Sequence, residues 1–458
     1  MKEETLVTIE NKYLFKKLAV IALPIALQSL IASSLSLVDN LMVGSLGETE
    51  LAAVGISIQM YFIHWMIMFG FTSGASTYMA QFWGAKDLRN IKRTTGFAIC
   101  VCFIISLVFF FIAMLLPHMV MRLFTDIPEL IQLGTGYIRM GAFTFLTISF
   151  TVPFTAALRT TQQTQVPLYI SIFVFGTNTF LNYVFIFGHF GAPKLGVVGA
   201  ALATLIARCF ELFLVLYVVF IKKNIVSGHI SEYFGWTKDL ISRIVKNAVP
   251  TTMNEALWAI GTAMYAAAYA RVGVTEYAAV QASNVINNLF IMAAFSIGDA
   301  TLILVGEKLG EGRLDFAYEL GKKLLRVGIV LGIVFGSMLI LCSKPIISLF
   351  DLTPEGQRYT FYILIVYGVF MWLAVYNGIS ITGILRSGGD TIFAMLIEMG
   401  SIWLYAVPMA FLTTLVWHLP IYLAVLLVKT EDLIKFFILL RRFLSKKWAR
   451  NVIDNIQN

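Results

Sequence analysis

The sequence of 458 residues contains few charged side chains. Asp, Glu, Lys and Arg together make up 13% of the chain, whereas soluble domains average about 25%. Apolar residues make up 59%, and the mean hydropathy is +0.81. These values exclude an ordinary soluble protein and predict an all-α polytopic membrane protein. At about 20 residues per crossing, with short connections, the length accommodates about twelve transmembrane helices.

The chain also lacks the patterns of several catalytic and binding sites. Its four cysteines lie in or beside apolar segments without metal-ligand spacing, which is typical of small buried residues. The five histidines form no ligand pair, and no GxxxxGK[ST] motif for a P-loop is present. The N-terminus carries Glu3, Glu4 and Glu10 and no small-residue cleavage site, so we expect no cleaved signal peptide. We predict neither an enzyme nor a resident cofactor.

Positive charge is distributed unevenly between the predicted connections. The two tails and alternate turns carry most of the 34 Lys and Arg residues. This bias predicts that both termini are cytoplasmic, in the plasma (inner) membrane. It also means that the surplus of Lys and Arg orients the chain in a membrane and does not indicate nucleic-acid binding. The expected spans cover approximately residues 18–43, 51–79, 94–116, 137–157, 167–188, 196–221, 244–270, 278–305, 323–342, 360–384, 391–413 and 419–440.

An internal repeat is visible at an offset of 226 residues. The segment GETELAAVGIS recurs at this offset as GVTEYAAVQAS. The same offset relates Pro24 to Pro250 and Gly84 to Gly310. Such agreement at one offset predicts that the chain consists of two related halves of six helices each.

The repeat sets the predicted domain organisation. We expect an N-lobe of residues 1–221, a polar and basic cytoplasmic linker of residues 222–243, and a C-lobe of residues 244–458. Because six is an even number, both halves enter the membrane from the same side. A pseudo-twofold axis along the membrane normal should relate them, with the substrate path between them near the midplane.

An acidic residue interrupts the apolar stretch of residues 251–269. Glu255 lies in its first half, and a charge in the hydrocarbon layer costs about 2.5–3.5 kcal/mol on insertion scales. It should therefore face a bundle interior or a wet cavity. We favour an ion or proton site over a structural acid satisfied by a neighbouring helix, whereas Glu398 and Glu431 are interpreted as structural. Possible C-lobe partners of Glu255, or residues lining the substrate path, are Trp258, Tyr265, Asp299, Tyr367 and Asn377.

A second candidate site lies in the first half. Asp39 ends a polar stripe on the first span, Asn178 and Asn182 lie one turn apart on the fifth, and the sixth contributes Thr204. A carboxylate with amide and hydroxyl oxygens suits a hard cation, and it suits a proton site tuned by hydrogen bonds equally well. The alternative is that Asp39 is an acid near the outer interface without a coupling role; the asparagine pair favours the functional interpretation.

Several motifs together resemble the multidrug and toxic compound extrusion (MATE) family. They are VDNLMVGSLGETELAAVG, LRTTQQTQVPLYISI followed by NTFLNYVFIFG, GVVGAALATLIAR, the Pro250–Glu255 segment and GILRSGGDT. The resemblance extends over nearly the whole chain and recurs in both halves. It implies two six-helix lobes forming a V-shaped central cleft. It also implies secondary active efflux of drug-like, often cationic, compounds in exchange for Na⁺ or H⁺ by rocker-switch alternating access.

The resemblance also assigns roles to individual residues. Glu255 resembles the family's C-lobe acid. Members linked to Na⁺ often pair that glutamate with an aspartate on the tenth helix, where this chain has Asn377. The choice between Na⁺ and H⁺ therefore stays open. The residues that resemble the family's N-lobe cation or proton site, the first three as possible Na⁺ ligands, are Asp39, Asn178, Asn182 and Thr204.

Two other function classes fit the sequence less well. A lipid-linked oligosaccharide flippase of the same superfamily should carry a conspicuous basic patch in its cleft, and the predicted spans contain few central Arg or Lys residues. A channel should have a selectivity-filter segment, and none is recognisable. We therefore predict an antiporter that acts as a monomer in the bilayer, with a small-molecule substrate, Na⁺ or H⁺ as coupling ion and no nucleic-acid partner.

Overall fold

The computed structural model of the protein describes residues 2–348, 350, 352–454 and 456. Within them it describes side chains from residue 16 onward, except at 289, 293 and 294. These described residues form helices joined by short turns, and no strand occurs among them. The all-α fold class predicted from the composition is confirmed.

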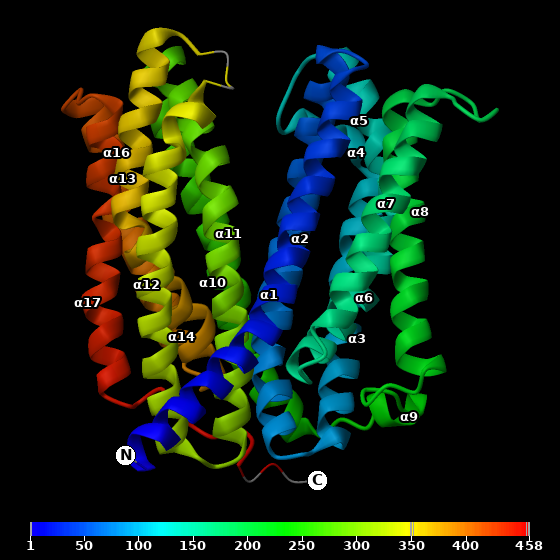
Figure 1. The fold of residues 1–458 in the computed structure, drawn as a ribbon. Helices are drawn as coiled ribbons and strands as arrows, with labels where there is room; N and C mark the ends of the chain where they lie inside the picture. Colours follow the sequence, from blue (N-terminus) through cyan, green and yellow to red (C-terminus); the bar gives the residue numbers. More distant parts are fainter. Residues whose placement is uncertain (1, 349, 351, 455, 457–458) are drawn as a thin grey trace. The chain divides into compact units, whose positions relative to one another are not determined.

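The first half of the chain forms nine α-helices and one short π-helix (Figure 1). They are α1 (Lys2–Gly44), α2 (Glu48–Gly84), α3 (Leu88–Leu115), α4 (Pro117–Arg122), α5 (Pro128–Gly141), α6 (Phe143–Thr160), α7 (Gln165–Phe187), α8 (Gly196–Leu216), η1 (Tyr217–Ile221) and α9 (Ile230–Tyr233).

The second half continues with long helices and ends in a series of shorter ones. They are α10 (Lys238–Ala270), α11 (Val274–Gly310), α12 (Leu314–Ile347), α13 (Pro354–Gly378), η2 (Ile379–Leu385), α14 (Thr391–Ser401), η3 (Ile402–Ala406), α15 (Val407–Phe411), η4 (Leu412–Val416), α16 (Ile421–Lys429) and α17 (Glu431–Leu444).

Each of the twelve predicted spans is helical over most of its length. Nine of the described helical segments are long and apolar enough to cross a membrane, or ten if α5 and α6, which meet at a 45° bend, count as one span. The last two spans are less regular than the apolar runs suggest. The eleventh runs through α14, η3, α15 and η4, where Pro408 lacks the N–H that a regular helix needs. The twelfth is divided at Thr430 between α16 and α17.

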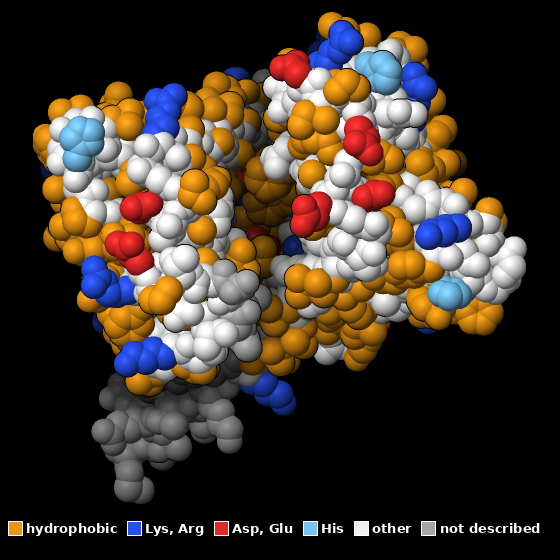
Figure 2. All heavy atoms as spheres, turned by 90° about the horizontal axis from the view of Figure 1, so that it is seen from above, with side chains coloured by type: hydrophobic (Ala, Val, Ile, Leu, Met, Phe, Trp, Pro, Cys, Tyr) orange, Lys and Arg blue, Asp and Glu red, His pale blue; other side chains and the backbone are white. Residues whose placement is uncertain are grey.

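Charged side chains are sparse at the end of the helices that lies away from the N-terminus. Figure 2 shows this end, where Lys, Arg, Asp and Glu stand singly or in small groups among hydrophobic and uncharged groups. The topology of the termini stays a prediction.

The chain divides into two compact units. Unit 1 comprises Met1–Ala26, Ala80–Ala85 and Val249–Asn455, and unit 2 comprises Leu27–Met79, Lys86–Ala248 and Ile456–Asn458. In unit 1, α12 packs beside α13, which also contacts α17 (Figure 1). In unit 2, α7 packs beside α8, and α3 packs beside α6. The predicted lobe boundaries follow the sequence repeat and not these contacts, and they stay a prediction.

Within unit 1, the last turns of α2 and α11 approach closely at two glycines. A Cβ on Gly84 would overlap the carbonyl oxygen of Glu307, and a Cβ on Gly310 would overlap that of Gln81. Gln81 and Glu307 are themselves separated by the repeat offset of 226 residues, so the contact is symmetric. Backbones can approach this closely only where no side chain intervenes, which explains a glycine at this position in both halves.

The C-terminal segment after α17 is held on unit 1. Trp448 is 0% exposed. The Gln81 amide donates to the backbone oxygens of Ser387 at 2.7 Å and Arg450 at 3.0 Å, and its oxygen accepts from the N–H of Val452 at 2.8 Å. One buried side chain therefore connects the end of α2 to two segments of the second half.

The predicted linker packs against α3 in unit 2. Gly96 on α3 leaves room for the backbone of Tyr233. A Cβ at residue 96 would overlap the carbonyl oxygen of Tyr233. Lys92 forms an ion pair with Glu232 at 3.2 Å. Two hydrogen bonds lower the pKa of Glu232 below its usual value. The one from Lys92 has the larger effect, and the one from the backbone N–H of His229 has the smaller. The linker is therefore a docked segment.

Candidate functional site

Four residues predicted for the first half form one hydrogen-bonded network in unit 2. The Asn182 amide donates to Asp39 Oδ1 at 2.5 Å and to Asn178 Oδ1 at 3.0 Å. The Asn178 amide donates to Thr204 Oγ1 at 3.3 Å. The network thus joins α1, α7 and α8, and it brings together every residue that the sequence suggested for this site.

The helical geometry of α7 explains why its two asparagines act together. Asn178 and Asn182 are four residues apart, so their side chains lie on one face of the helix, and both are 0% exposed. A buried amide needs hydrogen-bond partners, because leaving a polar group unpaired costs about 1–3 kcal/mol. Both amide nitrogens are used, but Asn182 Oδ1 is buried without a hydrogen-bond partner among the described residues.

A cavity of about 210 Å³ reaches this network. A cavity of this size is large enough to admit water, because one molecule needs only about 10–15 Å³ by this measure. Arg208 also lines the cavity, but its guanidinium pairs with Glu211 at 2.6 Å. Within the described part of the chain, Asp39 has no ion-pair partner within 4 Å. The polar residues lining the cavity are Ser36, Asp39, Asn40, Tyr61, Tyr137, Thr144, Thr204 and Arg208.

Glu255 has a different environment in unit 1. Its Oε1 lies 2.5 Å from Nη2 of Arg386, at the end of η2, and the Arg386 side chain is 1% exposed. Asn377, predicted as a partner of Glu255, instead donates to the backbone oxygen of Asp432 at 2.9 Å and to its Oδ1 at 3.2 Å. The expected pairing is therefore corrected. A buried guanidinium requires a carboxylate, and Glu255 supplies it.

The other residues predicted near Glu255 lie on three helices. The hydroxyl of Tyr367 on α13 donates to Asn284 Oδ1 at 2.8 Å, so Tyr367 is bonded to α11. Trp258 and Tyr265 on α10 and Asp299 on α11 are each partly buried. The Tyr265 hydroxyl has no hydrogen-bond partner among the residues that the structure describes.

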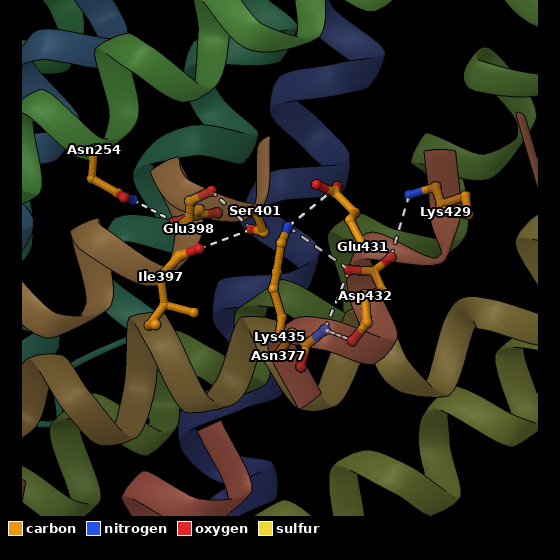
Figure 3. Close-up of polar contacts among 9 residues, drawn as sticks. All are labelled: Asn254, Asn377, Ile397, Glu398, Ser401, Lys429, Glu431, Asp432 and Lys435. Carbon is orange, nitrogen blue, oxygen red and sulfur yellow. Dashed lines mark hydrogen bonds and ion pairs between the residues drawn. The ribbon is translucent and has the colours of Figure 1, made fainter. Parts of the chain in front are cut away.

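Sequence reasoning missed a buried charge network formed by α16 and α17. Figure 3 shows Lys435 reaching between the two carboxylates of Glu431 and Asp432, at 3.2 and 3.9 Å. Lys429 lies 3.6 Å from Asp432 Oδ2. Glu431, Asp432 and Lys435 are each 5–6% exposed. The available signal was the run KTEDLIK, which places four charges within seven residues of the last predicted span.

Glu398 was interpreted as structural from the sequence, and its role stays a prediction. It lies on α14, and the amide of Asn254 on α10 donates to its Oε2 at 2.5 Å (Figure 3). Asn254 is 3% exposed, and its Oδ1 is buried without a hydrogen-bond partner in the described parts of the chain. The two residues are 144 positions apart, so no local pattern in the sequence connects them.

The structure brings no conventional metal-ligand cluster together among its described residues. No three His, Cys, Asp or Glu side chains gather there as a possible metal site. Oxygen ligands for a transported cation would come from carboxylate, amide and hydroxyl groups such as those around Asp39. Acids, amides and a cavity are groups with which a protein can bind and release an ion or a proton.

Comparison with known proteins gives consistent matches along the chain. The family model described as MatE matches residues 24–184 and 250–412. The probable multidrug resistance protein YoeA of Bacillus subtilis is 27% identical over 405 residues, covering 87% of this chain and 86% of that protein. The probable multidrug resistance protein NorM of Thermotoga maritima is 24% identical over 445 residues, covering 96% and 94%.

Solved structures share the fold at lower sequence identity. A MOP superfamily transporter from Pyrococcus furiosus is 17% identical, with a TM-score of 0.85 over 94% of this chain and 96% of that one. A multidrug resistance MATE transporter solved in an outward-facing conformation gives a TM-score of 0.86 at 17% identity, over 94% and 96% of the two chains. The helical arrangement of the chain is therefore that of a known transporter fold.

Proposed function

Because the chain belongs to the multidrug and toxic compound extrusion (MATE) family of transporters, we propose that it exports small organic compounds, often cationic, in exchange for an inward-moving ion. The family predicted from the sequence motifs is confirmed, and with it a multi-pass membrane transporter and not an enzyme. The relatives are named as multidrug resistance proteins, which does not favour the flippase alternative.

The observation that carries the proposal is the Asp39 network beside its cavity. Asp39 has an amide as its direct partner and the cavity beside it, so a proton or cation can reach the carboxylate without displacing a salt bridge. Antiport requires that ion and substrate favour different states of the protein, since a ligand with equal affinity for both states shifts nothing. In our proposal, binding of the ion to Asp39 favours the conformation that is open to one side of the membrane. Binding of the substrate favours the conformation that is open to the other side.

Of the two candidate ions, the hydrogen bonds support H⁺ better than Na⁺. Hard cations bind through several oxygens. In this network the oxygens of Asn178 and Thr204 already accept from amide N–H groups, and one Asp39 oxygen does too. Asn182 Oδ1 is the amide oxygen that stays unpaired among the described residues. Binding of one proton to Asp39 changes fewer of these hydrogen bonds than arranging several oxygen ligands around a Na⁺ ion would.

The decisive experiment is transport by purified protein in liposomes, with pH and Na⁺ gradients imposed separately. We expect a pH gradient to drive uphill efflux of a cationic dye such as ethidium. We expect Asp39→Asn to reduce its initial rate more than tenfold, because asparagine cannot bind the proton but still accepts the Asn182 hydrogen bond. Asp126→Asn, at an exposed acid, is the matched control. Efflux driven by Na⁺ alone would contradict proton coupling, and wild-type rates in Asp39→Asn would contradict the site.

We further propose that the protein works as a monomer in the plasma membrane with both termini in the cytoplasm. The excess of Lys and Arg in the tails and alternate turns supports this orientation. The linker between the predicted lobes, with Lys222, Lys223, Lys238 and Arg243, then lies on the cytoplasmic side.

A further inference from the structure

We propose that Glu398 and Asn254 form a second proton-exchange site, located in the second half of the chain. This inference rests on the proposed proton-coupled efflux and extends it, because it assigns the second coupling acid to a residue other than Glu255. It is based on the charge pairing inside unit 1 and on a hydrogen-bond arrangement shared with Asp39.

The first argument is that the other charges around Glu398 neutralise one another. Glu255 pairs with Arg386 at 2.5 Å. Figure 3 shows the adjoining network, in which two acids and two lysines neutralise one another. Glu398 has no ion-pair partner within 4 Å among the described residues, and its direct partner is the neutral amide of Asn254. Its charge can therefore be gained or lost without breaking an ion pair. The members of the adjoining network are Lys429, Glu431, Asp432 and Lys435.

The second argument is that Glu398 and Asp39 have the same kind of partner. In each pair, the amide nitrogen of an asparagine donates to one carboxylate oxygen at 2.5 Å. In each, the amide oxygen of that asparagine, Asn182 or Asn254, is buried with no hydrogen-bond partner among the described residues. Both asparagines are nearly or fully buried, at 0% and 3% exposed.

This arrangement can serve both protonation states of the acid. The amide presents a donor on one side and an acceptor on the other, and rotation of the amide group by about 180° exchanges them. With the carboxylate ionised, the amide N–H donates to it. When the carboxylate gains one proton, the new O–H can donate to the amide oxygen. The proton enters and leaves as H⁺, and no other bond is formed or broken.

The third argument is the placement of the two pairs on corresponding helices. The repeat relates the first span, α1, to the seventh, α10, and relates the fifth span, α7, to the eleventh, α14. In the first half the acid lies on α1 and the amide on α7. In the second half the amide lies on α10 and the acid on α14. Each half thus joins the same two helices through an acid and an amide, with the roles exchanged.

The surroundings of Glu398 connect its protonation to the rest of unit 1. Lys435 on α17 and Arg386 at the end of η2 attract its negative charge, whereas Glu255 on α10 repels it. Tyr265 on α10 is a further titratable group whose charge is coupled to that of Glu398. Adding a proton to Glu398 removes its attraction to Lys435 and Arg386. The charge network of α17 is therefore sensitive to whether the proton is bound.

The test compares Glu398→Gln with the wild type in liposomes, using ethidium as the substrate. Glutamine keeps an oxygen for the Asn254 amide but cannot exchange a proton, so the variant should fold. We expect efflux driven by a pH gradient to fall more than tenfold, while exchange of labelled for unlabelled ethidium at equal pH continues. Glu398→Asp, which keeps an acid, should restore part of the driven efflux. Glu319→Gln, at an exposed acid of α12, is the control.

The outcomes separate this inference from the proposed function. If Asp39→Asn abolishes driven efflux while Glu398→Gln retains the wild-type number of protons moved per ethidium, the second site is refuted and the proposed function stands. If wild type and Glu319→Gln show no efflux driven by a pH gradient, the proposed function fails and this inference fails with it. If Glu398→Gln does not fold, Asn254→Ala decides: it must shift the pH of half-maximal efflux, and an unshifted profile refutes the site.

Discussion

At the residue scale, the direct neighbours of an intramembrane acid decide what it can do. Glu255 and Asp39 are equivalent candidates in the sequence, since both interrupt apolar segments. In the structure Glu255 lies against a guanidinium, whereas Asp39 lies against an amide and a cavity. The direct partner of Glu255 is a cation, and the direct partner of Asp39 is a neutral amide. The structure therefore separates two acids that the sequence treats alike by the groups that contact them.

The Glu255 pair leads to a prediction about stability. We expect Glu255→Gln to lower the free energy of unfolding by about 3–5 kcal/mol, because it removes one charge from a buried ion pair in which Arg386 is 1% exposed. The double variant Glu255→Gln with Arg386→Leu should recover much of the loss. Thermal unfolding of the purified variants in one detergent measures both effects. A single variant as stable as the wild type would show that the pair is not important for folding.

Local patterns account for the part of the site that was predicted. The first-half site was predictable because Asn178 and Asn182 lie one turn apart beside an acid-bearing helix of the same half. The Arg386 pair and the Glu398 pair were not, because their members lie 131 and 144 positions apart. Neither partner follows a spacing rule, so the packing of α10 against the later helices has to be known first.

At the element scale, apolar length predicted where helices occur but not how regular they are. A membrane span needs about 20 apolar residues, and each of the twelve predicted spans is helical over most of its length. Interruptions depend on single residues and on buried charge. The eleventh predicted span contains two π-helical stretches around Pro408, and the twelfth is divided where its four charges begin. The mean hydropathy of these segments predicts neither the π-helical stretches nor the division of the twelfth span.

The linker provides a prediction for an element outside the membrane. We expect Gly96→Ala to weaken its docking on α3, because the added Cβ would overlap the Tyr233 carbonyl oxygen. Tryptic cleavage at the linker lysines, such as Lys222 and Lys238, should then become several times faster. Gly55→Ala is the control, since a Cβ there meets nothing within 4 Å. Equal cleavage rates for the two variants would argue that the linker is not held at this position.

At the scale of the whole molecule, the repeat is expressed in contacts as well as in sequence. The family model matches the chain twice, from residues 24 and 250, which differ by the repeat offset. The offset and the two glycines were recognisable from the sequence. The structural role of the glycines was not recognisable from the sequence, because a glycine in a helix can mark a turn, allow a close approach of two backbones or have no special role. The structure shows the close approach of α2 and α11 in unit 1.

We predict that Gly84→Ala and Gly310→Ala destabilise the protein to a similar extent. Inserting a methyl group into a tight contact typically costs about 1–3 kcal/mol, and here the neighbour in each case is a backbone carbonyl that cannot rotate away. Gly400→Ala should not destabilise, since a Cβ there meets nothing within 4 Å. Thermal unfolding of the three variants is the measurement. A large effect at one glycine with none at the other would contradict a symmetric contact.

The reciprocity of this glycine contact has a consequence for the origin of the chain. Gly84 meets Glu307 and Gly310 meets Gln81, so position i of one half meets position j of the other, and j meets i. That is the isologous form of a contact across the twofold axis of a homodimer. Two copies of a six-helix protein with one such glycine and its facing carbonyl could make this same reciprocal contact with each other. Fusing two copies of its gene would then need no new interface at this point.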